Sequence, residues 1–362
     1  MPLTTIAVGR VYDFSHVVGR NAASGTGFAY PHCIALTKGG IIYATNRGTE
    51  NNFSMRVNKV KIGAPGQEEF LGEFAKWGVG DGRSSWPFGV AVDSRGNVYV
   101  SDDWLHQISV FDGEGKFLSQ WGKAGSGDGE LNRPAGMIFD KADNLYVVDS
   151  GNNRIQKFTK DGKYLSKFGR AGSGAGEFNQ PWGITVDDGG HIYVADWKNH
   201  RVQKFSSDAK FLATFGHYGV VAPATFLQGQ VTPPEVFNKK VTEAGLLNHP
   251  TDVAVDPEGD VYVTDWANHR VCIFDSEGAH VATLIGEAQV LSKWGQMSID
   301  ANPDMKKARR RVKSLEPEWR FAFPTAVEFD PETYRIIVAD GQRQRLQIYV
   351  KDRNYLDPQA NL

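Results

Sequence analysis

Short stretches in which hydrophobic and polar residues alternate recur along the whole chain, and turns rich in Gly, Asn or Asp separate them. In one unit, residues 89–93 and 98–102 alternate on either side of a turn at 94–97, and further apolar stretches follow at 107–111 and 117–122. Alternation with a period of two, bounded by such turns, is typical of β-strands joined as hairpins. The pattern therefore predicts a unit of four short strands.

This four-stranded unit is repeated six times. Each copy starts at a proline before its first strand, and successive prolines are 56, 47, 47, 69 and 74 residues apart. A four-stranded unit that recurs every ~40 to ~50 residues is typical of a β-propeller with one blade per unit. We predict an all-β, six-bladed β-propeller that forms a single domain over residues 1–362, with blades that start near residues 31, 87, 134, 181, 250 and 324.

The two ends of the chain are predicted to share one blade. Residues 17–31 ("VVGRNAASGTGFAYP") match residues 167–181 ("KFGRAGSGAGEFNQP"), a segment that follows the outer strand of a blade. The chain thus begins with an outer strand and ends with three inner strands. An N-terminal strand that completes the last blade leaves no open sheet edge between the termini.

Extra residues enlarge three of the repeats. Two insertions, 217–248 and 287–322, fall in loops that lead from an outer strand to the next blade, and a third lies within 48–86. These loops share one face of a propeller, called the upper face below. We expect the insertions to build a binding surface or lid there, or else to fill a wide groove. Residues 287–322 carry the repeat on both flanks and are predicted to form a helical insertion over the upper face, not a linker between domains.

Composition narrows the class of protein. Hydrophobic residues make up 41% of the chain, and the formal charge of −2 provides no global basic field for nucleic acid or anionic lipid. The two cysteines are too few for a disulfide framework or a Cys-rich zinc site. Neither an apolar run of 18 residues nor a secretory signal is found, so a cytoplasmic protein without a membrane partner is expected.

The repeat resembles the NHL family of propellers. The resemblance rests on "WPFGVAVD", "VYVSD" and "NNRIQKF" and on the glycine-rich segment that precedes each proline; it covers essentially the whole chain, most strongly blades two to five. It implies the six-bladed fold. It does not select a function, because NHL propellers include enzymes, RNA binders and protein scaffolds.

Aromatic residues gather at the expected upper end of the central channel. Trp104, Trp197 and Trp266 follow the second strands of three blades, while Phe88 and Trp182 follow strand-starting prolines. Each tryptophan could instead wedge between neighbouring blades. Together they favour an aromatic-walled pocket for a flat or apolar ligand, because they would otherwise be exposed side by side.

Other recurring polar residues are interpreted as structural. Aspartates end the second strands of several blades and are expected to cap turn amides: Asp149, Asp196, Asp265 and Asp340. His200 and His269 open third strands at a position where another blade has Asn153, so we interpret them as surface or blade-packing groups.

The residues that break the repeat are the candidates for catalysis. His32 follows a proline, Arg47 stands after the second strand of blade one, and Asp103 is the extra aspartate of "DDW" in blade two. A histidine, an arginine and an aspartate that face one cavity could act as base, anion clamp and orienting group. His106 in "WLHQI" is a second candidate base near the same rim.

His32 and Arg47 also resemble positions of peptidyl-α-hydroxyglycine α-amidating lyase, a six-bladed propeller whose zinc histidines follow strand-starting prolines as "PH". The matching positions of the other blades hold no histidine here; they are Phe88, Ala135, Trp182, Thr251 and Thr325. One imidazole cannot form a three-ligand catalytic zinc site. The resemblance therefore implies the location of a site and not that enzyme's activity.

The sequence favours an enzyme of the lyase or hydrolase type that acts on a small, partly aromatic or apolar ligand. A non-catalytic propeller that docks a protein or peptide on its upper face is the alternative, and RNA binding through the basic residues 306–313 is a third hypothesis. No organic cofactor motif is found, and a metal in the central channel is left open.

Overall fold

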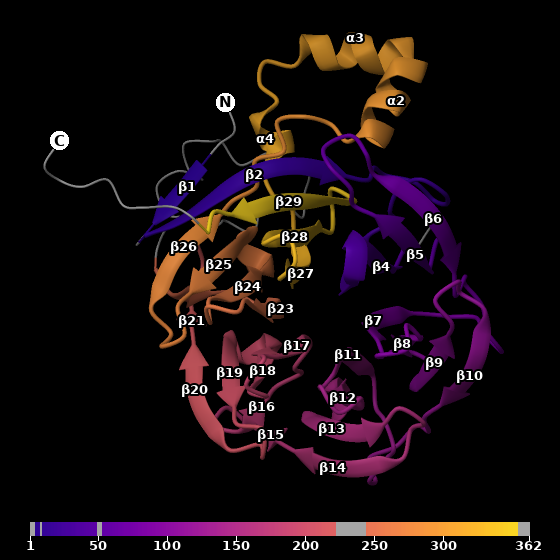
Figure 1. The fold of residues 1–362 in the computed structure, drawn as a ribbon, viewed down its shortest axis with the longest axis vertical. Coiled ribbons are helices and arrows are strands. Elements are labelled where there is room, and N and C mark those ends of the chain that lie inside the picture. The colour runs from indigo at the N-terminus through magenta and orange to yellow at the C-terminus, as the bar shows by residue number, and fades with distance from the viewer. Residues whose placement is uncertain (1–3, 8, 49–52, 222–243, 354–362) are drawn as a thin grey trace, which may run out of the picture.

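A computed structural model describes residues 4–7, 9–48, 53–221 and 244–353. Six antiparallel sheets stand around a central axis, each with one strand at the axis and one at the rim (Figure 1). This arrangement confirms the predicted all-β, six-bladed propeller. Five sheets have four strands, which are, from the inner to the outer one: β3 (Pro31–Thr37), β4 (Ile41–Asn46), β5 (Arg56–Lys61) and β6 (Glu69–Phe74) in blade 1; β7 (Pro87–Val92), β8 (Val98–Asp102), β9 (Gln107–Phe111) and β10 (Phe117–Trp121) in blade 2; β11 (Pro134–Phe139), β12 (Asn144–Asp149), β13 (Arg154–Thr159) and β14 (Tyr164–Phe168) in blade 3; β17 (Ile184–Val186), β18 (Ile192–Asp196), β19 (Arg201–Phe205) and β20 (Phe211–Phe215) in blade 4; and β23 (Pro250–Val255), β24 (Val261–Asp265), β25 (Arg270–Phe274) and β26 (His280–Leu284) in blade 5.

Blade 6 joins the two ends of the chain. Its strands run from the axis outward as β27 (Pro324–Asp330), β28 (Arg335–Asp340), β29 (Arg345–Lys351), β2 (Arg10–Val18) and β1 (Thr4–Ala7). The N-terminal β2 pairs antiparallel with the C-terminal β29, from Val18 opposite Leu346 to Tyr12 opposite Lys351. The predicted closure of the ring by the N-terminal strand is thus present.

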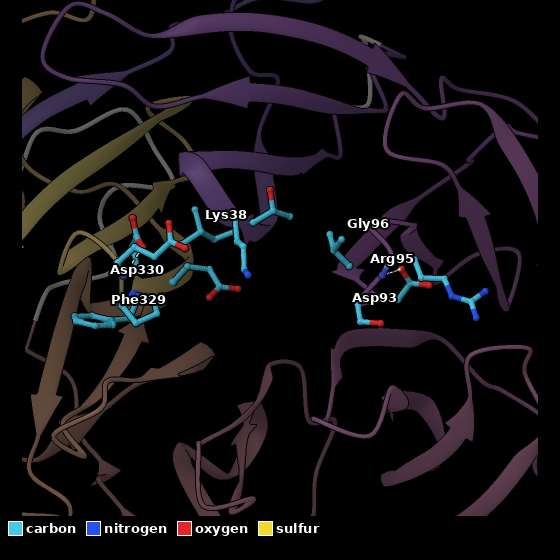
Figure 2. A pocket seen from close by; sticks show the side chains of 13 residues that line it. Lys38, Asp93, Arg95, Gly96, Phe329 and Asp330 are labelled. Atoms are coloured by element: carbon cyan, nitrogen blue, oxygen red, sulfur yellow. Dashed lines mark hydrogen bonds between the residues drawn. The ribbon is translucent and has the colours of Figure 1, made fainter.

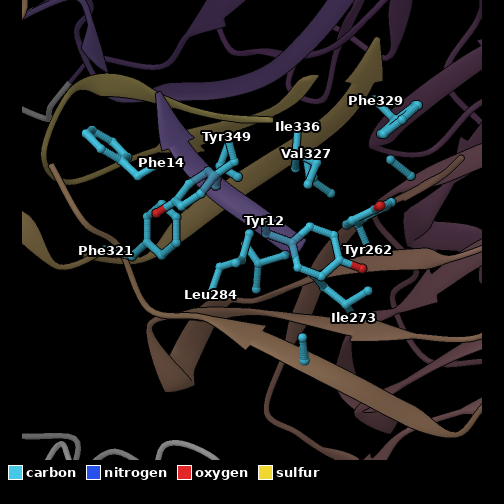
Figure 3. Packing of buried hydrophobic residues seen from close by; sticks show 14 of the residues in the cluster. Tyr12, Phe14, Tyr262, Ile273, Leu284, Phe321, Val327, Phe329, Ile336 and Tyr349 are labelled. Carbon is cyan, nitrogen blue, oxygen red and sulfur yellow. The ribbon is translucent and has the colours of Figure 1, made fainter. Parts of the chain in front are cut away.

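Hydrophobic side chains fill the seam between blades 5 and 6. Tyr12 and Phe14 of β2 lie in one buried cluster with Tyr349 of β29 and with Tyr262 and Leu284 of blade 5 (Figure 3). The Tyr12 and Tyr262 rings meet edge to face with centroids 6.4 Å apart. Burial of one such side chain contributes about 1.5–3 kcal/mol. The buried aromatic side chains of β2 therefore bind the N-terminal strand to blade 5 as well as to blade 6.

Charged groups reinforce the same seam. Lys351 of β29 reaches across to blade 5, where its ammonium group contacts Asp256 and lies 2.9 Å from Asp260. Arg10 of β2 also donates two hydrogen bonds to the Asp260 carboxylate. Both aspartates are nearly inaccessible to solvent, and these cations compensate for the loss of their hydration.

The inner strands lie close together around the channel. A Cβ atom on Gly136 would meet the backbone oxygen of Trp182 at 2.5 Å, and the Gly136 amide donates to that same oxygen. The Ser101 hydroxyl donates to the carbonyl of Ala135 in the next blade. Glycine after the repeat proline therefore permits backbone contact between neighbouring blades.

A second contact between blades explains the repeated histidines. His200 and His269 adopt left-handed backbone angles, with φ of 56° and 57°, at the start of their third strands. The His269 Nδ1 atom accepts a hydrogen bond from the Phe323 amide, and His200 Nδ1 accepts one from the His249 amide. Each amide belongs to the next blade, so these histidines are blade-packing groups.

The insertion at 287–322 forms three helices: α2 (Lys293–Ala301), α3 (Pro303–Arg311) and α4 (Glu316–Trp319). They lie at the outer rim beside β2 and β6 and not over the channel, as Figure 1 shows, so the expected position over the upper face is corrected. The cause is the buried Trp294 of α2, which packs with Phe28 and Ile62 in the seam between blades 1 and 6.

For the other large insertion, 217–248, residues 222–243 lie outside the described part of the chain. Short parallel pairs flank the crossings before blades 4 and 5: β15 (Arg170–Ala171) with β16 (Glu177–Phe178), and β21 (His217–Tyr218) with β22 (Leu246–Leu247).

Candidate functional site at the upper end of the channel

Six residues directly follow the repeat prolines at the inner strands; they are His32, Phe88, Ala135, Trp182, Thr251 and Thr325. The two threonines serve the fold, because their hydroxyls donate to the carbonyls of Pro324 and Pro31 in the neighbouring blades. The three large side chains that remain are available to form a site.

His32, Phe88 and Trp182 pack against one another. The His32 ring centroid lies 4.2 Å from that of Phe88 and 5.7 Å from that of Trp182, and the Phe88 and Trp182 centroids are 5.2 Å apart. His32 is only 5% exposed, and its buried Nδ1 atom makes no hydrogen bond within the described part of the protein. The cluster thus contains one buried polar atom without a hydrogen-bond partner among the described residues.

Arg47 joins the other two candidate groups. It follows β4, while Asp103 follows β8 of the next blade. One guanidinium nitrogen lies 3.2 Å from His32 Nε2, and another donates to Asp103 at 2.9 Å. The guanidinium carbon lies 5.1 Å from the centroid of the Trp86 ring and 5.2 Å from that of Phe88. The structure therefore brings the three candidate catalytic residues into one hydrogen-bonded chain within an aromatic surround.

The direction of the hydrogen bond from Arg47 sets which nitrogen of His32 carries the proton. An arginine can only donate, so His32 Nε2 accepts and the neutral ring carries its proton on Nδ1. Burial, followed by the Arg47 charge, holds the pKa of His32 well below its usual value. Burial also lowers the pKa of Arg47 to about 10, although the charge of Asp103 acts in the opposite direction. Burial raises the pKa of Asp103, although the charge of Arg47 acts to lower it. At neutral pH the site holds a neutral imidazole beside a charged guanidinium.

A band of aromatic rings continues from this cluster over blades 4 to 6. Trp182 stacks on Trp197 with centroids 4.4 Å apart and an interplanar angle of 4°. Trp197 contacts His249, whose ring is 6.4 Å from Trp266, and Trp266 packs against Phe323 at 4.7 Å. Three of the tryptophans predicted to bind substrate are thus joined in one band. Sequence reasoning missed His249 and Phe323, although each directly precedes a repeat proline.

The fourth predicted tryptophan lies apart from the band. Trp104 is 73% exposed and lines a cavity of about 520 Å³ over blades 2 and 3, together with Trp86, Asp103, His106, Asn132 and Arg133. Trp86, Asn132 and Arg133 were not identified from the sequence, because they occupy loop positions before the repeat proline that vary between blades. Asp103 belongs to both the cavity and the hydrogen-bonded chain, so the two features adjoin.

A second cavity, of about 630 Å³, lies at the opposite end of the channel among the turns of blades 1, 2 and 6. Figure 2 shows Lys38, Asp93, Phe329 and Asp330 around it. Asp93 and Asp330 accept hydrogen bonds from the backbone of their own turns, so turn chemistry accounts for them. Among the described residues, no group of three or more His, Cys, Asp or Glu side chains forms a potential metal site.

None of the described helices combines the length and the apolar character that a membrane crossing requires.

Two family models match the chain. The NHL repeat matches residues 178–205 and 247–274, and a 6-bladed β-propeller family matches residues 91–158. No curated protein matches the sequence.

Several solved structures share the fold at low sequence identity. A structural genomics protein of unknown function from Bacteroides thetaiotaomicron is 17% identical, with a TM-score of 0.59 over 95% of this chain and 76% of its own. A gluconolactonase from Xanthomonas campestris is 14% identical, with a TM-score of 0.55 over 95% and 90%. An inactive virginiamycin B lyase from Staphylococcus aureus, determined with quinupristin, is 12% identical, with a TM-score of 0.52 over 96% and 93%. These likenesses concern the fold.

Proposed function

We propose, from the premise that this chain is a six-bladed β-propeller with NHL repeats, that it is an enzyme of the lyase or hydrolase type for a small, partly aromatic or apolar substrate. The observation that carries the proposal is the hydrogen-bonded chain from His32 through Arg47 to Asp103. These are side chains that depart from the repeat, so the fold alone does not require them. Two structural neighbours are named as a lyase and a gluconolactonase, which agrees with an enzyme on this architecture.

Arg47 is the proposed anion clamp. Its guanidinium stays charged at neutral pH and is largely shielded from water, and a buried charge stabilises a developing oxyanion more strongly than an exposed one. Asp103 holds the guanidinium in place through a 2.9 Å hydrogen bond. A substrate oxygen that approaches Arg47 would compete with His32 Nε2 for the same donor.

His32 is the proposed base once this competition frees Nε2. In hydrolysis, Nε2 would take a proton from water while the hydroxide adds to a carbonyl carbon, and the oxyanion would lie against Arg47. The same proton would then pass to the leaving oxygen as the carbon–oxygen bond breaks. In a lyase reaction, Nε2 would instead take a proton from carbon and return it to the leaving group. The low pKa of His32 keeps its ring neutral at neutral pH, so Nε2 holds no proton before the reaction, while the same low pKa makes Nε2 a weaker base than a free imidazole.

The proposal is tested with a panel of small lactones, esters and aromatic-containing depsipeptides as substrates. We expect His32→Ala to lower kcat/KM by ~10²-fold to ~10⁴-fold, the usual effect of losing a general base. Arg47→Met should have a similar effect, and Arg47→Lys a smaller one. His191→Ala is the matched control, because His191 is partly exposed and pairs with Asp187 in a turn between inner strands. Unchanged turnover of a confirmed substrate by His32→Ala and Arg47→Met would remove these residues from the mechanism.

An anionic partner is a second candidate, and α3 favours it. Four basic residues on and after this helix are exposed and have no ion pair in the described structure; they are Lys307, Arg310, Arg311 and Lys313. Lys306 and Arg309 pair with Asp300 and Glu318. RNA binding through this helix predicts salt-sensitive retention on an RNA column that is lost when the four residues are changed to glutamine. Retention that is unchanged by these substitutions would exclude α3 as the contact.

A further inference from the structure

We infer that the cavity over blades 2 and 3 is the substrate-recognition site and that it takes a small planar acid, an aromatic ring that carries a carboxylate. This inference rests on the proposed function for the position of the reaction, and it adds the class of ligand. Its starting point is Trp104. The equivalent residues Trp197 and Trp266 are covered by neighbouring rings, whereas Trp104 is 73% exposed at the cavity.

Two indole rings border the cavity. Trp86 and Trp104 both line it, and Arg47 lies 5.1 Å from the centroid of the Trp86 ring. Indoles provide flat apolar surface that loses little conformational entropy on binding, and a planar ring that stacks on them buries area on both partners. The volume of about 520 Å³ lies within the ~300 to ~1,000 Å³ range of small-molecule sites. The walls therefore suit an aromatic body.

The polar groups of the cavity are mainly donors. Arg133 is half-exposed, and its guanidinium lies 3.7 Å from the Asp103 carboxylate, at ion-pair distance and beyond a close hydrogen bond. The Arg133 amide donates to His106 Nδ1, so the proton of a neutral His106 is on Nε2 and can be donated to a ligand. Asn132 adds an amide group to the same lining.

The carboxylate acceptor of the cavity, Asp103, already accepts a hydrogen bond from Arg47. The Asp103 carboxylate is 6% exposed and accepts the short hydrogen bond from Arg47. In the described part of the chain the carboxylate beside Arg133 is Asp103, at 3.7 Å, so Arg133 keeps donors for a ligand, as does His106 through Nε2. A carboxylate matches the planar fork of an arginine through two parallel hydrogen bonds, which a neutral amide cannot reproduce. The donors therefore select an acid, and the indoles select its aromatic ring.

The inference is tested by titrating 2-naphthoate and indole-3-acetate, with their primary amides as neutral counterparts, into the purified protein by calorimetry. We expect the acids to bind at least ~10-fold more tightly than the amides, because a carboxylate forms charge-assisted hydrogen bonds with the Arg133 guanidinium that a neutral amide cannot form. Arg133→Gln should weaken acid binding by a similar factor without changing amide binding. Trp104→Leu should weaken both.

Matched controls separate recognition from general effects. Arg170→Gln changes another exposed arginine, and Trp77→Leu changes another half-exposed tryptophan, so both should leave the affinity within ~2-fold. Equal affinity for acids and amides, no acid binding at millimolar concentration, or unchanged binding in Arg133→Gln would overturn the inference. His32→Ala distinguishes it from the proposed function, because it should lower turnover by ~10²-fold to ~10⁴-fold while the acids still bind. Acid binding in a protein that turns over no substrate would keep the recognition site and remove the enzyme.

Discussion

Histidine and asparagine are interchangeable at one position of the repeat because both offer an acceptor atom. His269 Nδ1 receives the Phe323 amide, His106 Nδ1 the Arg133 amide, and Asn153 Oδ1 the Gln180 amide. In each case the acceptor lies at the start of a third strand in the left-handed region of φ, which histidine and asparagine enter more readily than most residues. The feature that these loops share is therefore a hydrogen bond between blades.

Substitution of His269 tests this contact. His269→Asn should leave the free energy of unfolding within about 1 kcal/mol, whereas His269→Ala should lower it by about 1–3 kcal/mol through a buried amide without an acceptor. The measurement is urea unfolding followed by circular dichroism. Equal destabilisation by the two variants would show that ring packing against Phe323, and not the hydrogen bond, is what matters.

The same residue makes stability depend on pH. Burial lowers the pKa of His269 to about 4, below the ordinary 6.5, so the folded state binds fewer protons than the unfolded state between these values. Its contribution is therefore complete above pH 6.5 and is lost as the pH falls towards 4. His269→Asn should reduce the decrease in melting temperature between pH 7 and pH 4.5 relative to the wild-type protein. An identical decrease in both proteins would contradict this assignment.

At the scale of elements, the ring depends on how β2 is held. The strand pairs with β29 and also packs its aromatic residues on blade 5, so it contributes hydrogen bonds, apolar burial and ion pairs together. The helices α2 to α4 project from the rim; the buried Trp294 anchors α2, and Arg345 and Gln347 of β29 donate hydrogen bonds to backbone carbonyls at α4. Both segments are thus held to the ring by polar as well as apolar contacts.

Lys351→Met tests the ionic part of this closure. The change keeps the aliphatic stem but leaves Asp256 and Asp260 without the ammonium group, so we expect a loss of about 3–5 kcal/mol, as for a broken buried ion pair. Lys61→Met is the control, since its pair with Glu69 is exposed and such pairs contribute about 0–1 kcal/mol. Thermal unfolding and amide exchange of β2 measure the effect. Similar stability of the two variants would show that apolar packing alone closes the ring.

At the scale of the whole molecule, the ring creates a channel that brings like charges together. Glu328 of β27 and Asp252 of β23 belong to neighbouring inner strands, and the Asp252 carboxylate accepts the Val327 amide. Burial, with the charge of Asp252 in addition, raises the pKa of Glu328 to about 8, and burial raises that of Asp252 to about 7. Closing the ring therefore favours protonation of both groups.

This pair gives a pH dependence of opposite sign to that of His269. Between an ordinary carboxyl pKa near 4.5 and about 8, the folded state binds more protons than the unfolded state, so stability decreases as the pH rises through this range. Glu328→Gln should raise the melting temperature at pH 8.5 by a few degrees and have little effect at pH 5. Glu332→Gln is the control, because Glu332 is exposed and lines, with Glu328, the cavity at the opposite end of the channel. A variant that is less stable than wild type at pH 8.5 would mean that the Glu328 charge is favourable in the channel.

The sequence by itself determined the number of blades, their starting points and the closure of the ring. These features follow from local chemistry that is repeated: alternation sets the faces of each strand, a proline opens each unit, and the match between residues 17–31 and 167–181 marks an outer strand. The sequence also selected His32, Arg47 and Asp103, because each departs from its repeat.

Only the tertiary structure decided which of these side chains meet and what surrounds them. It placed Trp182, Trp197 and Trp266 in one band, left Trp104 exposed beside Arg133, and positioned the helices of 287–322 at the rim. The reason is that these contacts join residues of different blades. Their distances depend on how the sheets are rotated about the common axis and on which large side chain fills each seam, and no local pattern in the sequence records either quantity.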